Sequence, residues 1–367
     1  MVVIHVLPNI FSESGGTSTV VADLCQSLIS REIDCKVLLS ESSSKDIYLN
    51  SNCSKIIYNF SYWNFISRVF FFKNLDKIFP DDKDKIFHIH GIWHPFNHFI
   101  ISWLKHRKIP YVVHIHGMLE VWAISYKKYK KIIAGYLYQK NDLKMAKTLI
   151  VSSNQELLSV KKYIDHDSVC IAGNGIFPIP DRIKNTKFGK KRDYVFISRV
   201  HPKKGLLNFL KAWSQVSPLD STFTIAGPNE NSHLEEVLSL VYELDLQDRV
   251  RYVGTVDGEL KVQLLSNAFC LVLPTFSENF GMIVLEALEQ GIPVITTLGT
   301  PWEILNDKRC GWCVEPTVEG LAEALRDSAL IDKDSWLELS SNARNLARSF
   351  YWDSVIQGYI NIYKGML

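Results

Sequence analysis

The chain has 367 residues, of which 47% are hydrophobic and 22% are charged, so its composition excludes a disordered protein and is typical of a globular one. This length exceeds what a single compact core usually serves and therefore predicts two domains. The formal net charge is only +2, and the strongly basic stretch is local, which disfavours a nucleic-acid-binding function.

No stretch of the sequence reaches the 18 or so consecutive apolar residues that a transmembrane helix needs. The nearest, residues 89–104, contains several histidines and is interrupted by Pro95. Residues 1–8 form a strand-like run without the basic start and cleavage site of a signal peptide. The chain has seven cysteines, and an odd number without a signal peptide is typical of a reduced, cytoplasmic protein.

Apolar runs of strand length alternate with helical patterns through the first half of the chain. Strands are expected at residues 4–7, 35–39, 86–89, 111–115 and 148–152. Residues 17–30 place apolar side chains at helical spacing between the first two of these strands. This alternation predicts a parallel sheet with helices on both faces.

A second alternation follows a segment rich in proline and basic residues, at 174–192. Its strands are expected at residues 194–197, 222–225, 250–253, 270–273 and 294–296. The fold class is therefore α/β, with two Rossmann-like, doubly wound parallel-sheet domains that face a cleft. We place the first domain at residues 1–178 and the second at residues 190–351. Residues 352–367 have the apolar spacing of a final helix.

Two glutamates eight residues apart, Glu278 and Glu286, stand in the most informative part of the sequence, Ser-Glu-Asn-Phe-Gly-Met-Ile-Val-Leu-Glu-Ala. An apolar strand precedes them, Gly281 marks a turn, and a helix is expected to begin near Met282 and Ile283. Open parallel sheets bind ligands at the carboxyl ends of their strands. The N–H groups at the helix start suit a phosphate, and the two carboxylates suit sugar hydroxyls.

Arg199 and Lys204 follow the first strand of the second domain, in the string Ser-Arg-Val-His-Pro-Lys-Lys-Gly. They are five residues apart across a strand-to-helix turn, so both side chains can reach one pocket. Fixed cations at that place would stabilise a diphosphate, whose negative charge grows as it leaves. A solvated basic turn is the alternative reading, and the neighbouring Lys203 is not assigned a role.

In the first domain, Gly15 and Gly16 follow the first strand, and His116 ends a later one. The glycines let a ligand approach the backbone, but they do not form the Gly-x-Gly-x-x-Gly of a nicotinamide site. The string His-Ile-His-Gly occurs at 88–91 and again at 114–117, with no acidic or cysteine partner near either copy in the chain. Because zinc needs three or four converging ligands, we expect no metal site.

The string at 277–281, followed by Glu286-Ala287 and by Gly-Ile-Pro-Val at 291–294, resembles the donor-site signature of retaining glycosyltransferases of family 4, also called glycosyl transferases group 1. That family has the two-domain GT-B fold and includes sucrose synthase, mannosyltransferases and bacterial polysaccharide glycosyltransferases. The resemblance spans nearly the whole chain and is strongest from 194 to 314. Gly-Thr-Pro-Trp at 299–302 is similar to a string of bacterial polysaccharide members.

The resemblance implies a role for each of these residues. Glu286 would hold the ribose of a UDP- or GDP-sugar, and Glu278 would hold the hexose. Arg199 and Lys204 would stabilise the departing diphosphate in place of a metal ion, so no cofactor is implied. His116 would orient the transferred sugar. The donor pocket would further include Gly16, Gly227, Phe280, Gly281, Met282 and Ile283, and Gly15 and Trp93 would lie on the acceptor side with His116. Ser198 departs from the family, which usually has glycine before the arginine.

The reaction implied by the resemblance is the transfer of a hexose, with retained anomeric configuration, to a lipid-linked saccharide during surface polysaccharide or O-antigen biosynthesis. The helix at 352–367 would return to the first domain. A sugar-nucleotide epimerase or hydrolase of the same fold is one alternative. A non-catalytic scaffold of the GT-B fold is another, which the intact pairs of cations and glutamates disfavour.

Residues 122–147 contain seven lysines, five Trp and Tyr residues and a single acid, Asp142. They lie in the more basic half of the chain, because residues 1–180 hold 21 Lys and Arg against 15 Asp and Glu. Basic stretches interleaved with aromatic residues bind anionic bilayers. We therefore expect peripheral attachment of the first domain to the inner face of the cell membrane. The alternative is a solvated helix face whose aromatic side chains pack into the core.

Overall fold

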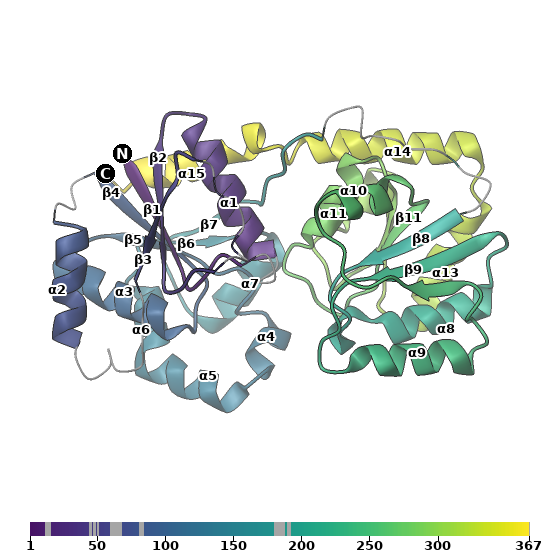
Figure 1. Ribbon diagram of the computed structural model, residues 1–367, viewed down its shortest axis with the longest axis horizontal. Coiled ribbons are helices and arrows are strands. Elements are labelled where there is room, and N and C mark those ends of the chain that lie inside the picture. Colours follow the sequence, from purple (N-terminus) through teal and green to yellow (C-terminus); the bar gives the residue numbers. More distant parts are fainter. Residues whose placement is uncertain are drawn as a thin grey trace. The chain divides into compact units, whose positions relative to one another are not determined.

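The structure, a computed structural model, describes residues 1–11, 16–43, 46, 49, 51–58, 68–80, 84–179, 188 and 192–366. The chain forms two compact units. Unit 1 consists of Met1–Gly175 and Trp352–Leu367, and unit 2 consists of Ile176–Tyr351. Each unit is a parallel sheet with helices on its two faces (Figure 1).

The sheet of unit 1 has seven strands in the order β3-β2-β1-β4-β5-β6-β7. They are β1 (Val2–Leu7), β2 (Asp34–Leu39), β3 (Ser54–Ile57), β4 (Lys85–His90), β5 (Tyr111–His114), β6 (Thr148–Val151) and β7 (Val169–Ile171). All neighbouring strands run parallel. The strand order reverses between β1 and β4, the place where doubly wound sheets bind their ligands.

Helices connect these strands. They are α1 (Gly16–Ile29), α2 (Arg68–Ile78), α3 (Pro95–Arg107), α4 (Val121–Ser125), α5 (Lys128–Ala134), the π-helical turn Gly135–Gln139, α6 (Lys140–Lys144), α7 (Asn154–Tyr163) and the final helix α15 (Trp352–Lys364). Local chemistry sets the bounds of α3, because the His94 side chain accepts from the Phe96 N–H, Pro95 fixes the first helical residue and Lys108 ends the helix in a left-handed conformation. Within the part of the chain that the structure describes, no helix has the length and apolar character to cross a bilayer.

The two faces of the unit 1 sheet differ in chemistry, because successive side chains of a strand point to opposite faces. Ile4 and Phe87 belong to an apolar core that includes side chains of α3. The residues that follow them, His5 and His88, are fully buried on the opposite face. The helix α15 packs beside α1 and reaches this histidine-bearing face, where the Tyr363 hydroxyl lies 2.8 Å from His88 Nδ1.

The sheet of unit 2 has six parallel strands in the order β10-β9-β8-β11-β12-β13. They are β8 (Arg192–Ile197), β9 (Ser221–Ala226), β10 (Val250–Tyr252), β11 (Cys270–Leu273), β12 (Val294–Thr297) and β13 (Gly311–Val314). The connections are a 3-10 turn (Pro202–Lys204), α8 (Leu206–Val216), α9 (His233–Glu243), α10 (Gly258–Ser266), α11 (Met282–Glu289), α12 (Ile304–Asp307), α13 (Val318–Leu330) and α14 (Lys333–Arg348). The order again reverses between β8 and β11.

Two parallel α/β sheets, together with the return of α15 to unit 1, confirm the predicted fold class. The sequence did not predict β3, β7 or β13. All three are sheet edges of three or four residues, too short for their alternation to stand out. The proline-rich basic segment at 174–192 lies partly outside the described residues.

Candidate functional site

The loop between β11 and α11 carries the predicted donor signature. Gly281 ends it with φ 76°, a left-handed conformation that suits glycine, and a Cβ there would lie 3.2 Å from Glu278 Cγ. The Glu278 N–H donates to the Gly299 carbonyl at 2.7 Å, and the Trp302 indole donates to the Phe280 carbonyl. These bonds fix the loop on both sides of Glu278. The first N–H groups of α11, at Met282 and the residues after it, therefore begin directly beside that carboxylate.

Lys204 and Glu278 form an ion pair at this loop. Lys204, buried at the end of the 3-10 turn, donates from Nζ to Glu278 Oε2. Burial alone would raise the pKa of Glu278, but the positive charge and hydrogen bond of Lys204, helped by Lys203 and Arg199, hold this pKa below its ordinary value. Glu278 is therefore a carboxylate at neutral pH.

Arg199 lies at the carboxyl end of β8 and is more exposed than Lys204. Its Nη1 is 2.7 Å from Glu230 Oε2, and 56% of its side chain is accessible. Its charge nevertheless reaches Glu278, whose pKa it lowers. The charges of Arg199 and Lys204 therefore both act on one carboxylate, that of Glu278.

Glu286, in the second turn of α11, pairs with Lys261 of α10, and the two charged atoms are 2.7 Å apart. Neither Lys261 nor Glu230 was predicted from the sequence. Neither has a local signal, because each meets its partner only through the packing of elements that are 25 or more residues apart in the chain. Glu286 and Glu278 lie on one strand–loop–helix connection, as predicted.

Gly227 lies where the carboxyl ends of β8 and β9 meet, beside Arg199. Its φ is 137°, and an added Cβ would stand 1.9 Å from the Ser198 carbonyl oxygen. Only glycine allows this approach. The Gly227 N–H donates to the Gly254 carbonyl at 2.8 Å, which holds the turn in place.

In unit 1, His116 follows β5 with φ 54° and is half-buried. Its Nε2 lies 3.0 Å from His90 Nδ1, and its ring stacks on His114 at 3.8 Å between centroids. Burial lowers the pKa of His116 to about 3, so the ring is neutral at physiological pH. A neutral imidazole can donate or accept a hydrogen bond, but it cannot serve as a fixed cation.

Glu156, which the sequence analysis did not single out, supports the loop of His116. It is fully buried, and its carboxyl group accepts from the Gly117 N–H and, at 2.6 Å, from the Ser152 N–H. Burial raises the pKa of Glu156 to about 7, although these two bonds act in the opposite direction. The loop that presents His116 is therefore tied to an acid that titrates near neutral pH.

The other residues predicted in unit 1 lie on separate loops. Trp93 has φ 76°, its N–H donates to Gln139 Oε1 at 2.9 Å, and its indole donates to the Met118 carbonyl at 3.2 Å. Gly16 is the exposed first residue of α1. Gly15 lies outside the described residues.

Possible metal-ligand groups occur in unit 1. Ligand atoms lie within 4.8 Å of one another in three sets among the described residues: His5, His88 and His90; His5, Cys25 and Cys35; and His90, His114 and His116. None of these sets includes a predicted donor residue of unit 2. Only the third contains a predicted site residue, His116.

Solved structures define the class to which this fold belongs. Sucrose-phosphate synthase from Thermosynechococcus elongatus has a TM-score of 0.80 at 18% identity, over 100% of this chain and 99% of that one. Anabaena HepE, solved in complex with UDP and glucose, has a TM-score of 0.77 at 15% identity, over 100% of both chains. At such identities the likeness establishes the fold, which is that of the GT-B glycosyltransferases.

Sequence comparisons identify the family. Residues 14–178 match the family described as Glycosyltransferase Family 4, and residues 179–346 match the one described as Glycosyl transferases group 1. Together these matches cover most of both units, and the chain therefore belongs to the family 4 type of GT-B glycosyltransferases. An uncharacterized 41.2 kDa protein in the cps region of Klebsiella pneumoniae is 27% identical over 99% of both chains. O-antigen chain mannosyltransferase B of Escherichia coli is 27% identical over 50% of this chain and 55% of its own.

Proposed function

We propose that this glycosyltransferase moves a hexose from a UDP- or GDP-sugar to a lipid-linked saccharide, with retention of configuration and without a metal ion, in surface polysaccharide or O-antigen biosynthesis. The observation that carries the donor assignment is the ion pair of Lys204 with Glu278, in the loop that leads into α11, with the charge of Arg199 also acting on that carboxylate. The names of the two relatives, one from a cps region and one an O-antigen mannosyltransferase, favour the pathway. HepE was solved with UDP and glucose, which favours a nucleotide-sugar donor.

The cations of unit 2 are assigned to the diphosphate. Lys204 is buried and already oriented by Glu278, so little reorganisation is needed when negative charge develops beside it. Arg199 is held by Glu230 in an exposed pair, which costs little to exchange for a diphosphate. The N–H groups at the start of α11 add partial positive charge. This set supplies what a divalent cation would otherwise provide.

The two glutamates are assigned to hydroxyl groups of the donor. Glu286 accepts hydrogen bonds from the ribose, and its pair with Lys261 fixes the direction of its carboxylate. Glu278 is ionised because its pKa is held low, so it accepts from hexose hydroxyls. Charged hydrogen bonds of this kind contribute about 1.5–3 kcal/mol each.

The proposed reaction proceeds on one face of the sugar. The bond from the anomeric carbon to the diphosphate oxygen breaks with its electron pair on that oxygen, the acceptor hydroxyl oxygen bonds to the same carbon, and the hydroxyl proton passes to a diphosphate oxygen. No side-chain nucleophile is required. His116, neutral because its pKa is about 3, orients the sugar by a hydrogen bond. Trp93 is assigned to the acceptor side, with Gly15 and Gly16 bordering the donor and acceptor.

Residues 122–147 are proposed to attach the enzyme to an anionic membrane surface from the cytoplasmic side. The single acid of this segment, Asp142, is fully buried, forms an ion pair with Lys105 and is hydrogen-bonded to His98, each at 2.6 Å. The lysines therefore face no acidic side chain of the segment itself. Tyr129 and Tyr136 are 82% and 90% exposed, which argues against the alternative that the aromatic side chains pack in the core. Further large apolar side chains are exposed in this segment, namely Ile132, Ile133 and Leu137, and Val121 just before it is exposed as well.

A donor screen tests the proposal. Thermal unfolding of the full chain is followed with a panel of UDP-, GDP- and ADP-sugars, and a ligand at 100 times its dissociation constant should add about 2.7 kcal/mol of stability. The stabilising donor is then incubated with membrane-extracted lipid-linked saccharides, and the anomeric configuration of the product is read by NMR. Product with inverted configuration would contradict retention. Release of free or epimerised sugar without an acceptor would favour the hydrolase or epimerase alternative.

A further inference from the structure

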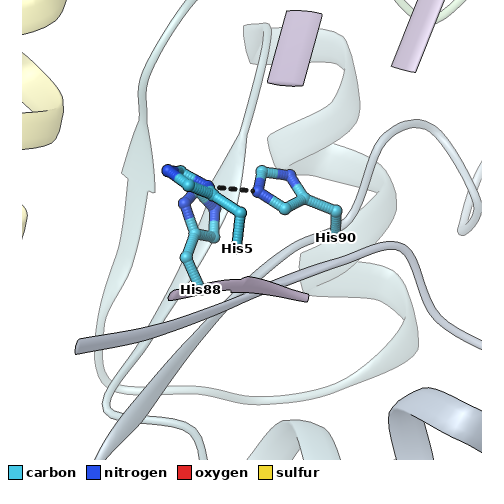
Figure 2. Close-up of side chains that lie close together, drawn as sticks. All are labelled: His5, His88 and His90. Carbon is cyan, nitrogen blue, oxygen red and sulfur yellow. Dashed lines mark hydrogen bonds between the residues drawn. The ribbon is translucent and has the colours of Figure 1, made fainter. Parts of the chain in front are cut away.

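The buried polar face of the unit 1 sheet holds more titratable groups than the proposed reaction uses. Three imidazoles from two adjacent strands, His5, His88 and His90, point to the same side (Figure 2). All three are at most 2% exposed. Three cysteines also lie near this side of the fold, at positions 25, 35 and 53 of the chain, and each is free and at most 6% exposed.

His5 is the residue that joins the imidazoles to the thiols. One ring nitrogen, Nδ1, lies 2.9 Å from His90 Nε2 (Figure 2). The other, Nε2, is buried and has no hydrogen-bond partner. A buried nitrogen without a partner is destabilising unless a ligand occupies it.

The thiols come from three different elements. Cys25 lies on α1, Cys35 on β2, which pairs with β1, and Cys53 directly precedes β3. The ligand atoms of Cys25, Cys35 and His5 are all within 4.8 Å of one another. The Cys25 thiol lies within hydrogen-bonding reach of both Cys35 and Cys53. Cys53 lies near Cys25, but its sulfur is outside the set of atoms that lie within 4.8 Å of one another, so it would have to move inward to complete the site.

We infer that His5 Nε2 and the sulfurs of Cys25 and Cys35 bind one zinc ion in unit 1, with Cys53 as the fourth ligand. Tetrahedral zinc with Zn–S of about 2.3 Å and Zn–N of about 2.0 Å places its ligand atoms about 3.5–3.8 Å apart, so the group needs only a small contraction. Two thiolates neutralise the charge of the ion. Mixed nitrogen and sulfur ligands favour zinc over magnesium or calcium.

The alternative set of three imidazoles is a weaker site. Binding a metal to His5, His88 and His90 together would break the hydrogen bond between His5 and His90. The mixed set, which is His5 with the cysteines, keeps this bond. In the mixed set, the Nδ1–H of His5 donates to His90 Nε2, the arrangement by which a metal-bound histidine is commonly oriented. His88 Nδ1 is already engaged by the Tyr363 hydroxyl.

The same bond connects the zinc site to His116. If His5 donates to His90, the His90 Nδ1–H must donate to His116 Nε2, at 3.0 Å. That leaves the proton of His116 on Nδ1 and fixes the ring as a donor through that nitrogen. The ion would therefore be structural, set apart from the transfer chemistry, and would act on it only by holding this tautomer.

Metal content of the full-length protein tests the inference without any assay of activity. Protein produced with added Zn2+ is dialysed, and its metal is measured by mass spectrometry; one zinc per chain is expected. Replacement by Co2+ should give thiolate-to-cobalt charge-transfer absorption and the visible bands of tetrahedral cobalt. Cys25→Ala and Cys35→Ala should lose both signals, and Cys170→Ala, a half-buried cysteine of the same unit outside the group, should keep them. His90→Gln should retain the site with an affinity about 10- to 100-fold lower.

The wild-type protein alone can overturn the inference, so unstable variants do not weaken the test. Absence of zinc after purification, together with no cobalt–thiolate band, would exclude the site. Alkylation and mass measurement under non-reducing conditions would reveal a disulfide between two of the three cysteines, which would also contradict it. If zinc binds, prolonged chelation should lower the melting temperature, and Zn2+ but not Mg2+ should restore it.

Discussion

Lys204 and Glu278, separated by 74 residues in the chain, form an ion pair at the carboxyl edge of the unit 2 sheet. The pair explains why Glu278 stays ionised although its side chain is only 21% exposed. Because each partner orients the other, removing one should disturb the other. Arg199 is exposed and pairs with Glu230, so its substitution leaves the Lys204–Glu278 pair in place. It is therefore the better residue for testing the role of a single cation.

Arg199→Ala should lower turnover more than it lowers donor affinity, because the charge of the diphosphate grows toward the transition state. Loss of one preorganised group at such a site typically costs about 10²–10³ in kcat. The unfolding free energy should change by less than about 1 kcal/mol, since the pair with Glu230 is exposed. Steady-state kinetics and donor titration are compared with those of Lys203→Ala. Equal losses in binding with unchanged turnover would point to simple anchoring.

Metal independence follows from the same assignment. A brief treatment with EDTA, followed by Mg2+ or Mn2+, should leave the turnover of the wild-type enzyme unchanged. Activity that disappears with the chelator and returns with either hard cation would mean that Arg199 and Lys204 do not replace a metal at the diphosphate.

Glu286→Ala should weaken binding of the nucleotide sugar about tenfold or more, because the ribose hydroxyls lose a charged acceptor. Calorimetric titration of the donor gives the affinity. Lys261→Met is the matched control: it removes the partner of Glu286 but leaves the carboxylate in place, so the loss should be smaller. If Glu286→Ala bound the nucleotide sugar with wild-type affinity, Glu286 would not be the residue that holds the ribose.

The sequence predicted the parts of the site that are local in the chain. Glu278, Gly281 and Glu286 lie on one strand–loop–helix connection. Its strand, turn and helix follow one another directly in the chain, so their patterns could be recognised in the sequence. Their partners, Glu230 and Lys261, could not be predicted, because they depend on which strands and helices become neighbours. The group of His5 with the cysteines was missed for the same reason: the sheet order places β2 beside β1, while along the chain no cysteine stands near a histidine pair.

Gly227→Ala should destabilise unit 2 by about 2 kcal/mol or more, because the new Cβ would collide with the Ser198 carbonyl at a φ that alanine avoids. Denaturant unfolding measures the loss. Gly254→Ala separates the effect of the collision from the effect of the backbone conformation. Gly254 also has a positive φ, 78°, but its Cβ position has open space around it. It should cost about 1 kcal/mol. Equal effects of both substitutions would show that the collision with Ser198 relaxes freely.

Glu156 should make stability fall as the pH rises. Its pKa is about 7 in the folded protein and near 4.5 when unperturbed, so the folded state holds the proton more tightly. The stabilisation that the raised pKa of Glu156 provides is complete below pH 4.5. It is lost as the pH rises through 7, and the unfolding free energy falls by about 3 kcal/mol in all. Unfolding free energies of wild type and Glu156→Gln are compared at pH 5 and 8, and the decline should be smaller in the variant. Parallel pH curves would contradict the raised pKa.

The lysines of residues 122–147 should attach the protein reversibly to anionic membranes. Each lysine near such a surface contributes about 1 kcal/mol, screened by salt, and the exposed Tyr129 and Tyr136 can enter the headgroup region. Sedimentation with vesicles of neutral or anionic lipid, at low and high salt, measures the attachment. Replacing Lys127, Lys128, Lys130 and Lys131 with Gln should reduce pelleting with anionic vesicles.

The double variant Tyr129→Ser, Tyr136→Ser should weaken the part of the attachment that persists at high salt. Donor binding should be unchanged in both variants, because neither replaces a residue that is assigned to the donor. Identical pelleting of the lysine variant and wild type would mean that these lysines form only a solvated helix face.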